Sequence, residues 1–420
     1  MRASLSTRVV AGAASLIALA WIGGSVGRWA RAWRDDAAPA AAAPRPIVEA
    51  PRVLGREEYC LVCHAGVTGL DVSHRPESIG CASCHGGNVQ AREAKLAHEG
   101  MIRIPGNLTD AASTCGQAAC HAAIVPRISR SIMTTMSGVI EVDRRVFGDT
   151  ASADAPHVAS LGRSAADSHL RQLCASCHLG QSKTQWGPVA ESSRGGGCNA
   201  CHLQYDSLAV RQLAAYASTA PRDRTGIPTR HPSFTIAVDN AKCFGCHSRS
   251  GRISTSYEGW HEMAEPPSAS QLAADHKAPV PQYRLLADGR YFTRVAPDVH
   301  QARGMDCVDC HTAGEVMGTG APVQHARDQV QIRCEDCHAS RLNSVPAQHA
   351  DAETSRLHAL RGWRFGADDR LGVSASGAVL SNVVVAPGSP PRLRRKLSGA
   401  WSPLRAPRAV CTQGAGHARL

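Results

Sequence analysis

Large aromatic side chains are scarce in this chain of 420 residues, which has only 7 Trp, 6 Tyr and 5 Phe. Its length would suit two or three ordinary domains, but this aromatic content is little for a conventional core of that size. Ordering the backbone costs about 1–2 kcal/mol per residue, and so few large side chains can hardly offset it. The chain also lacks a nucleic-acid-binding motif. We therefore expect an interior that is not built from side chains alone.

Cysteine, by contrast, is frequent, and 16 of the 17 cysteines form pairs that are each followed directly by histidine. Seven pairs have two residues between the cysteines, and the eighth pair has four. The strict copies are Cys60-Cys63-His64, Cys81-Cys84-His85, Cys174-Cys177-His178, Cys198-Cys201-His202, Cys243-Cys246-His247, Cys307-Cys310-His311 and Cys334-Cys337-His338. The stretched copy is Cys115-Cys120-His121, and only Cys411 stands outside the pattern.

The pattern C-x-x-C-H is the attachment motif of c-type haem. Each thiol adds to one vinyl group of the porphyrin, and the adjacent imidazole supplies an axial ligand to the iron. Zinc sites also use C-x-x-C pairs, but they rarely place histidine after every pair. A disulfide scaffold gives no reason for the histidines. The motifs predict eight covalently bound c-type haems, whose flat apolar rings fill the interior.

The formal net charge of the chain is +11, and the predicted haems would change this balance. The paired propionates of each haem bring negative charge, which arginine neutralises well. The basic surplus is therefore better explained by propionates than by a nucleic-acid surface.

The N-terminus predicts export. Arg2 and Arg8 precede the uncharged run Val9–Gly27, and further arginines follow it. Residues 1–36 are either a signal peptide or an N-terminal membrane anchor, and the Ala/Pro-rich residues 37–47 form a linker. Both alternatives place the rest of the chain outside the cytoplasm, in the periplasm or anchored to the inner membrane.

The spacing of the motifs predicts an array. First cysteines are separated by 21, 34, 59, 24, 45, 64 and 27 residues, which marks three couples that begin at Cys60, Cys174 and Cys307. We expect an octahaem domain over residues 48–350, with haem segments of about 48–150, 151–250 and 251–350. Its expected fold is that of a multihaem cytochrome c, mostly coil with short α-helices packed around the haems and little β structure.

The second axial ligand of each iron decides between an electron relay and an enzyme. Twelve histidines lie outside the motifs, more than enough for eight irons. His74 and His300 share a register, because each lies seven residues before the first cysteine of a motif, and this favours ligation within the same couple. The predicted distal ligands are His74, His98, His169, His231, His261, His300, His325 and His349. Met133, Met136 and Met317 are alternatives that would raise the potential of their haem.

The chain resembles the multihaem cytochromes c with doubled C-x-x-C-H motifs, which carry electrons in respiring bacteria. The resemblance covers about residues 57–340, and the run from Val299 to Gly318 is similar to segments of such cytochromes. Octahaem hydroxylamine oxidoreductase and tetrathionate reductase match the haem count. The first uses a tyrosine cross-linked to its active haem, which no tyrosine here is marked to provide. The second replaces one motif histidine with lysine, whereas all eight motifs here end in histidine.

The C-terminal region, residues 351–420, contains no haem motif. Alternating apolar residues around Leu371–Val385 predict a small β-rich appendage. The final residues, with Cys411 and His417, suggest a reading frame cut short before a further haem site; the alternative is an ordinary tail with one unpaired thiol.

The sequence therefore predicts an exported octahaem c-type cytochrome that relays electrons in a respiratory chain. The expected partners are other cytochromes, membrane quinol-oxidising enzymes or an outer-membrane electron conduit. The alternative is a multihaem reductase or oxidase of nitrite, hydroxylamine or tetrathionate with one open haem iron.

Overall fold

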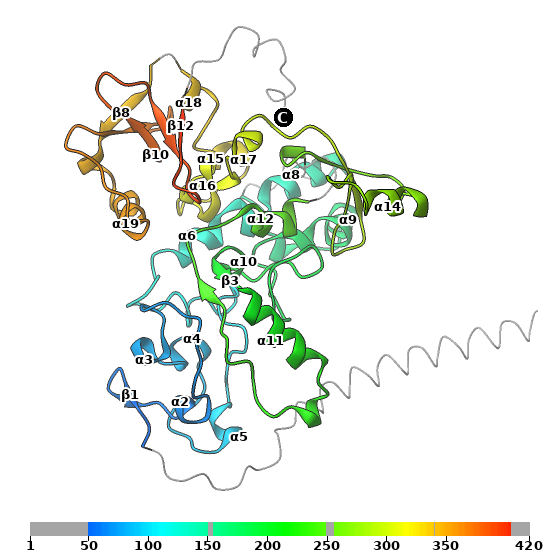
Figure 1. Ribbon diagram of the computed structural model, residues 1–420, viewed down its shortest axis with the longest axis vertical. Helices are drawn as coiled ribbons and strands as arrows, with labels where there is room; N and C mark the ends of the chain where they lie inside the picture. Colours follow the sequence, from blue (N-terminus) through cyan, green and yellow to red (C-terminus); the bar gives the residue numbers. More distant parts are fainter. Residues whose placement is uncertain (1–48, 150–153, 249–255, 340, 405–420) are drawn as a thin grey trace, which may run out of the picture. The chain divides into compact units, whose positions relative to one another are not determined.

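A computed structural model describes residues 49–149, 154–248, 256–339 and 341–404 of the chain (Figure 1). These residues form two compact units. The first joins the N-terminal stretch up to Ile102 to the later segment Tyr205–Ser233, and the second contains Arg103–Gln204 and the chain from Phe234 onward. The units thus divide the chain differently from three successive haem segments, because a distant segment packs with the N-terminal one.

The first unit consists mainly of single-turn helices joined by irregular chain. Helices of four residues are marginal on their own, because nucleation of a helix costs more than a few hydrogen bonds return. The longest helix, α11, is capped by the Asp206 carboxylate, which accepts the backbone N–H of Ala209. The elements are β1 (Arg52–Val53), β2 (Arg56–Glu57), α2 (Cys60–Cys63), α3 (Pro76–Ile79), α4 (Ala82–His85), α5 (Ala94–Ala97), α11 (Ser207–Ser218) and η3 (Pro221–Asp223).

The second unit has a helical part and two antiparallel sheets. Its helices are α6 (Val125–Arg130), α7 (Ile132–Thr135), α8 (Ser137–Val146), η1 (Val158–Ser160), α9 (Ala165–Leu173), η2 (Ala175–Cys177), α10 (Cys198–His202), α12 (Asn240–His247), α14 (Ala269–Asp275), η4 (Gln301–Arg303), α15 (Cys307–Cys310), α16 (Ala313–Met317), α17 (Ala326–Gln329), α18 (Glu335–His338), η5 (Ala347–His349) and α19 (Ala352–Leu360). The short strands β3 (Leu203–Gln204) and β4 (Ser233–Phe234) lie where the chain passes between units.

The pair α8 and α9 holds the best-defined helical core. Met136, Ile140, Val158 and Leu170 are buried together. A bidentate ion pair joins the two helices, since Nε of Arg144 lies 2.8 Å from Oδ1 of the buried Asp167. This core is small, as expected for a chain with few aromatic residues.

A five-stranded antiparallel sheet forms near the C-terminus, with the strand order β12-β11-β10-β9-β8. Its interior face is aliphatic, with Leu371, Leu380, Val383 and Leu393 almost fully buried. The strands are β8 (Asn343–Pro346), β9 (Arg370–Val373), β10 (Val379–Val385), β11 (Arg392–Arg394) and β12 (Trp401–Pro403). The strands β9 and β10 occupy the stretch with alternating apolar residues, while β8 begins before residue 351.

A second sheet lies within the expected haem region, where the sequence suggested little β structure. It has the order β5-β7-β6, with β5 (Trp260–Glu262), β6 (Tyr283–Leu285) and β7 (Tyr291–Arg294). The turn between β6 and β7 contains Asp288-Gly289, a dipeptide that favours tight hairpin turns. Phe292 on β7 is buried.

The N-terminal run expected to be a signal peptide or anchor lies outside the described residues. Within the described part of the chain, we find no helix both long and apolar enough to span a membrane.

Candidate haem-binding sites

Four of the seven strict motifs share one backbone closure, in which the N–H of the histidine donates to the carbonyl oxygen of the first cysteine. The N···O distances are 2.8 Å for His64 and 2.9 Å for His85, His311 and His338. This bond brings both thiols and the imidazole onto a single turn, the arrangement that covalent attachment and iron ligation require.

The stretched motif closes in the same way. The N–H of His121 donates to the carbonyl of Cys115 at 3.0 Å, although two more residues separate them than in the strict copies. The additional residues form a turn of their own, in which the N–H of Cys120 donates to the carbonyl of Gln117 at 2.8 Å. The longer loop therefore keeps the closing bond of these four strict motifs.

Three motif histidines are oriented by a hydrogen bond from Nδ1. Nδ1 of His85 lies 2.9 Å from the carbonyl oxygen of Ile102, and Nδ1 of His202 lies 2.9 Å from that of Thr235. Nδ1 of His311 lies 2.8 Å from Oε2 of Glu315. A neutral imidazole that donates from Nδ1 keeps its lone pair on Nε2, which is the tautomer that binds a metal.

Three motif histidines also lie beside a second histidine that the sequence predicted as a distal ligand. The ring centroids are 6.0 Å apart for His64 and His98, 6.2 Å for His85 and His231, and 5.9 Å for His300 and His338. Two imidazoles that bind one metal from opposite sides, each through a bond of about 2 Å, have centroids roughly 6 Å apart. The donor sets therefore fit three haem irons with two histidine ligands each.

The backbone holds His231 beside His85. The N–H of His231 donates to the carbonyl of Thr68 at 2.8 Å, and its Nδ1 lies 2.6 Å from the carbonyl oxygen of Pro232. Two segments of the chain approach closely at Gly69, where a Cβ would lie only 2.0 Å from the carbonyl oxygen of His231. Glycine is thus required at this position.

Two further predicted distal ligands hydrogen-bond to carboxylates. Nδ1 of His74 lies 3.1 Å from Oδ1 of Asp71, and Nδ1 of His169 lies 3.0 Å from both carboxylate oxygens of Asp143. In the neutral ring, each bond leaves Nε2 with its lone pair.

The other three predicted ligands have different surroundings. His261 on β5 and His349 in η5 are exposed. His325 is the N-cap of α17, where its backbone N–H donates to Oδ2 of Asp328 at 3.2 Å.

Among the histidines that we did not predict to bind iron, His358 has a structural role. Its Nε2 lies 2.6 Å from the carbonyl oxygen of Ser381, and its ring packs against Phe365. His417 lies outside the described residues.

The methionines considered as ligands pack in apolar clusters. Met136 belongs to the core of α8 and α9, while Met133 and Met317 pack against buried Ile128 and Leu179. Packing of this kind is the usual role of methionine.

Thiols of different motifs lie next to one another. Three pairs of thiols are close enough that one shifts the pKa of the other: Cys81 acts on Cys60, Cys198 on Cys115, and Cys243 on Cys307. Electrostatic interactions link Cys177 and Cys201 to Cys246, and Cys310 to Cys337. Burial raises the pKa of Cys201 and of Cys246 to about 11, so both are protonated thiols at neutral pH. In the second unit the motif sites are therefore contiguous.

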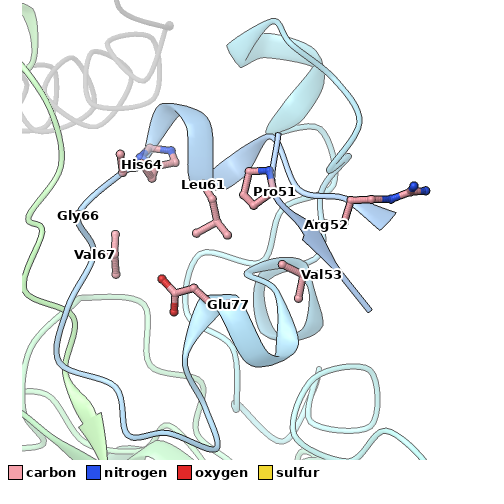
Figure 2. Close-up of a pocket in the computed structure, with 9 residues that line it drawn as sticks. Pro51, Arg52, Val53, Leu61, His64, Gly66, Val67 and Glu77 are labelled. Atoms are coloured by element: carbon pink, nitrogen blue, oxygen red, sulfur yellow. The ribbon is translucent and has the colours of Figure 1, made fainter. Parts of the chain in front are cut away.

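A pocket of about 290 Å³ lies beside the first motif (Figure 2). Its lining is largely apolar, with Pro51, Val53, Leu61 and Val67, and His64 at its edge. Ligand pockets typically have volumes of about 300–1,000 Å³ and mostly apolar walls. This one has room for part of a flat apolar ring beside His64.

Among the described residues, no group of three or more His, Cys, Asp and Glu side chains is placed to hold a metal ion by itself. Haem iron differs from such a site, because it takes four ligands from the porphyrin and only its axial ligands from the protein.

Comparison of the chain with protein-family models, curated proteins and solved structures finds no match.

Proposed function

We propose that this chain is an exported electron-transfer cytochrome that carries eight covalently bound c-type haems. The observation that carries the proposal is the combination of motif and geometry. Eight motifs supply two thiols and an imidazole each. Three of their histidines lie beside a second histidine at 5.9–6.2 Å between ring centroids.

The chain's own residues would hold the cofactors as follows. The paired cysteines form the thioether bonds, and the motif histidine supplies the first axial ligand. His98 would supply the second protein ligand to the iron bound by His64. In the same way, His231 would bind the iron of His85, and His300 would bind the iron of His338. For the other irons, the second ligand remains a prediction among His74, His169, His261, His325 and His349.

A bound haem supplies a one-electron redox centre. Two histidines on one iron leave no position for a substrate, so such a site exchanges electrons without binding small molecules. The contiguous motif sites of the second unit support a relay, since neighbouring centres pass electrons to one another. We propose other cytochromes, quinol-oxidising membrane enzymes or an outer-membrane conduit as partners outside the cytoplasm.

Carbon monoxide binding to the reduced holoprotein tests this function. The spectrum should stay unchanged if every iron has two protein ligands. A spectral change in the wild-type protein would reveal an open iron and favour the reductase or oxidase alternative; nitrite, hydroxylamine and tetrathionate would then be tested as substrates.

Single alanine variants of His98, His231 and His300 test the three pairings. Each should gain one carbon monoxide site, because one iron loses its second ligand. His276→Ala is the matched control, because His276 is an exposed histidine outside the motifs. Variants whose reduced spectrum does not change with carbon monoxide would refute the pairings.

A further inference from the structure

The Nδ1 partners of the axial histidines differ in charge. His85 and its opposite histidine, His231, both donate to neutral backbone carbonyls. His311 donates to the carboxylate of Glu315, and His300 lies 2.9 Å from the carboxylate of Asp298. Two carboxylate partners thus belong to the couple that begins at Cys307, and two others, Asp71 and Asp143, lie beside His74 and His169.

The Glu315 carboxylate is fixed in place. Its Oε1 accepts the backbone N–H of Ile332 at 2.8 Å and that of Gln331. The backbone N–H of Glu315 is capped by the Thr312 hydroxyl at 3.1 Å. The carboxylate thus points at His311 without side-chain freedom to move away.

Burial decides which carboxylates act strongly on their histidine. The side chain of Glu315 is 6% exposed and that of Asp298 is 9% exposed, whereas Asp143 beside His169 is 17% exposed and Asp71 beside His74 is 44% exposed. A charge screened by water acts weakly on its neighbour, and a buried charge acts strongly. The His311 side chain itself is 60% exposed, which leaves room for a cofactor beside it, while its Nδ1 is hydrogen-bonded to Glu315.

A carboxylate that accepts the Nδ1–H of a ligand makes the imidazole a stronger electron donor. Stronger donation stabilises ferric over ferrous iron and lowers the reduction potential of that haem. We propose that Glu315, acting through His311, and Asp298, acting through His300, place the haems of Cys307 and Cys334 at the low-potential end of the array. The haem of Cys81, with two carbonyl-bonded histidines, has a higher potential.

This inference rests on the proposed haem-binding function and deepens it, because it names the couple from which electrons pass to haems of higher reduction potential. The amine of Lys396 lies 3.4 Å from the carbonyl oxygen of His311 and opposes the effect with its positive charge. Because Lys396 is unchanged in a Glu315 variant, the difference between variant and wild type isolates the carboxylate.

Glu315→Gln tests the inference in the full holoprotein, since glutamine keeps the size and the acceptor oxygen but removes the charge. Spectroelectrochemical titration should show one haem whose midpoint rises by about 59 mV or more, the one-electron equivalent of a tenfold change in ferric preference. Electron paramagnetic resonance should show an altered low-spin signal for the same haem. Glu265→Gln is the control, because it removes one charge from an exposed position.

Asp298→Asn provides a second, independent variant, and it carries the test if Glu315→Gln does not yield holoprotein. It should raise the midpoint of one other haem. Unchanged midpoints in variants that retain eight low-spin haems would overturn the inference and leave the proposed function standing. Loss of the haem-binding function itself would appear differently, as a wild-type protein without covalent haem.

Discussion

The contact at Gly69 offers a sharp test of how the fold positions an axial ligand. Gly69→Ala would place a Cβ 2.0 Å from the carbonyl oxygen of His231, at a backbone φ of +116°. The left-handed backbone costs an L-residue about 1–2 kcal/mol, and the steric overlap adds about 1–3 kcal/mol. Gly55→Ala is the matched control in the same unit, since Gly55 has φ +79° but no atom within 4 Å of a built Cβ. Gly55→Ala should therefore lose only the free energy that a left-handed backbone costs an L-residue.

The assay combines thermal unfolding with carbon monoxide binding to the reduced holoprotein. Gly69→Ala should lose about 2–5 kcal/mol of unfolding free energy, and it should gain one carbon monoxide site because His231 moves away from His85. Gly55→Ala should lose about 1–2 kcal/mol and gain no site. The reasoning would be refuted if the two variants were equally stable and both stayed silent to carbon monoxide.

Further predictions concern the stretched motif, the helix pair and the cofactor-free chain. Replacing Cys115 and Cys120 together by alanine should remove one covalent haem, measured by intact mass; an unchanged haem count would exclude this site. Arg144→Ala should cost about 2–3 kcal/mol in thermal unfolding, because it strands the buried Asp167 carboxylate, whereas Arg222→Ala, at a side chain 87% exposed, should cost about 0–1 kcal/mol. Equal losses would contradict this account of the helix pair. Expressed without haem attachment, the chain should show no cooperative unfolding transition, and a cooperative one would show that its own core suffices.

The local geometry of the motifs could be predicted from the sequence, because the spacing of C-x-x-C-H leaves few ways to close the turn. The register of His300 also predicted ligation within its couple, and its ring lies beside that of His338. The same register at His74 predicted ligation within the Cys60 couple, whereas our proposed pairings join His64 to His98 and His85 to His231. The other partners lie far apart in sequence, as His85 and His231 do. No spacing rule links such positions, and only tertiary packing brings them together.

The groups that orient the histidines were missed for different reasons. The carbonyls of Ile102 and Thr235 belong to the backbone and leave no trace in the sequence. Glu315 does leave one, since it lies four residues after His311 and can reach it within one helical turn. The hairpin of β6 and β7 also has a signal in the sequence, because Asp288-Gly289 favours a tight turn between two strands.

The count of covalently bound haem tests the central claim most directly. The chain would be expressed in a host that matures c-type cytochromes, and the haem per chain would be measured by intact mass and pyridine haemochrome absorbance. The account predicts eight haems, one for each Cys-Cys-His motif. Seven haems would contradict the assignment of the stretched site, and a mature protein without covalent haem would contradict the account as a whole.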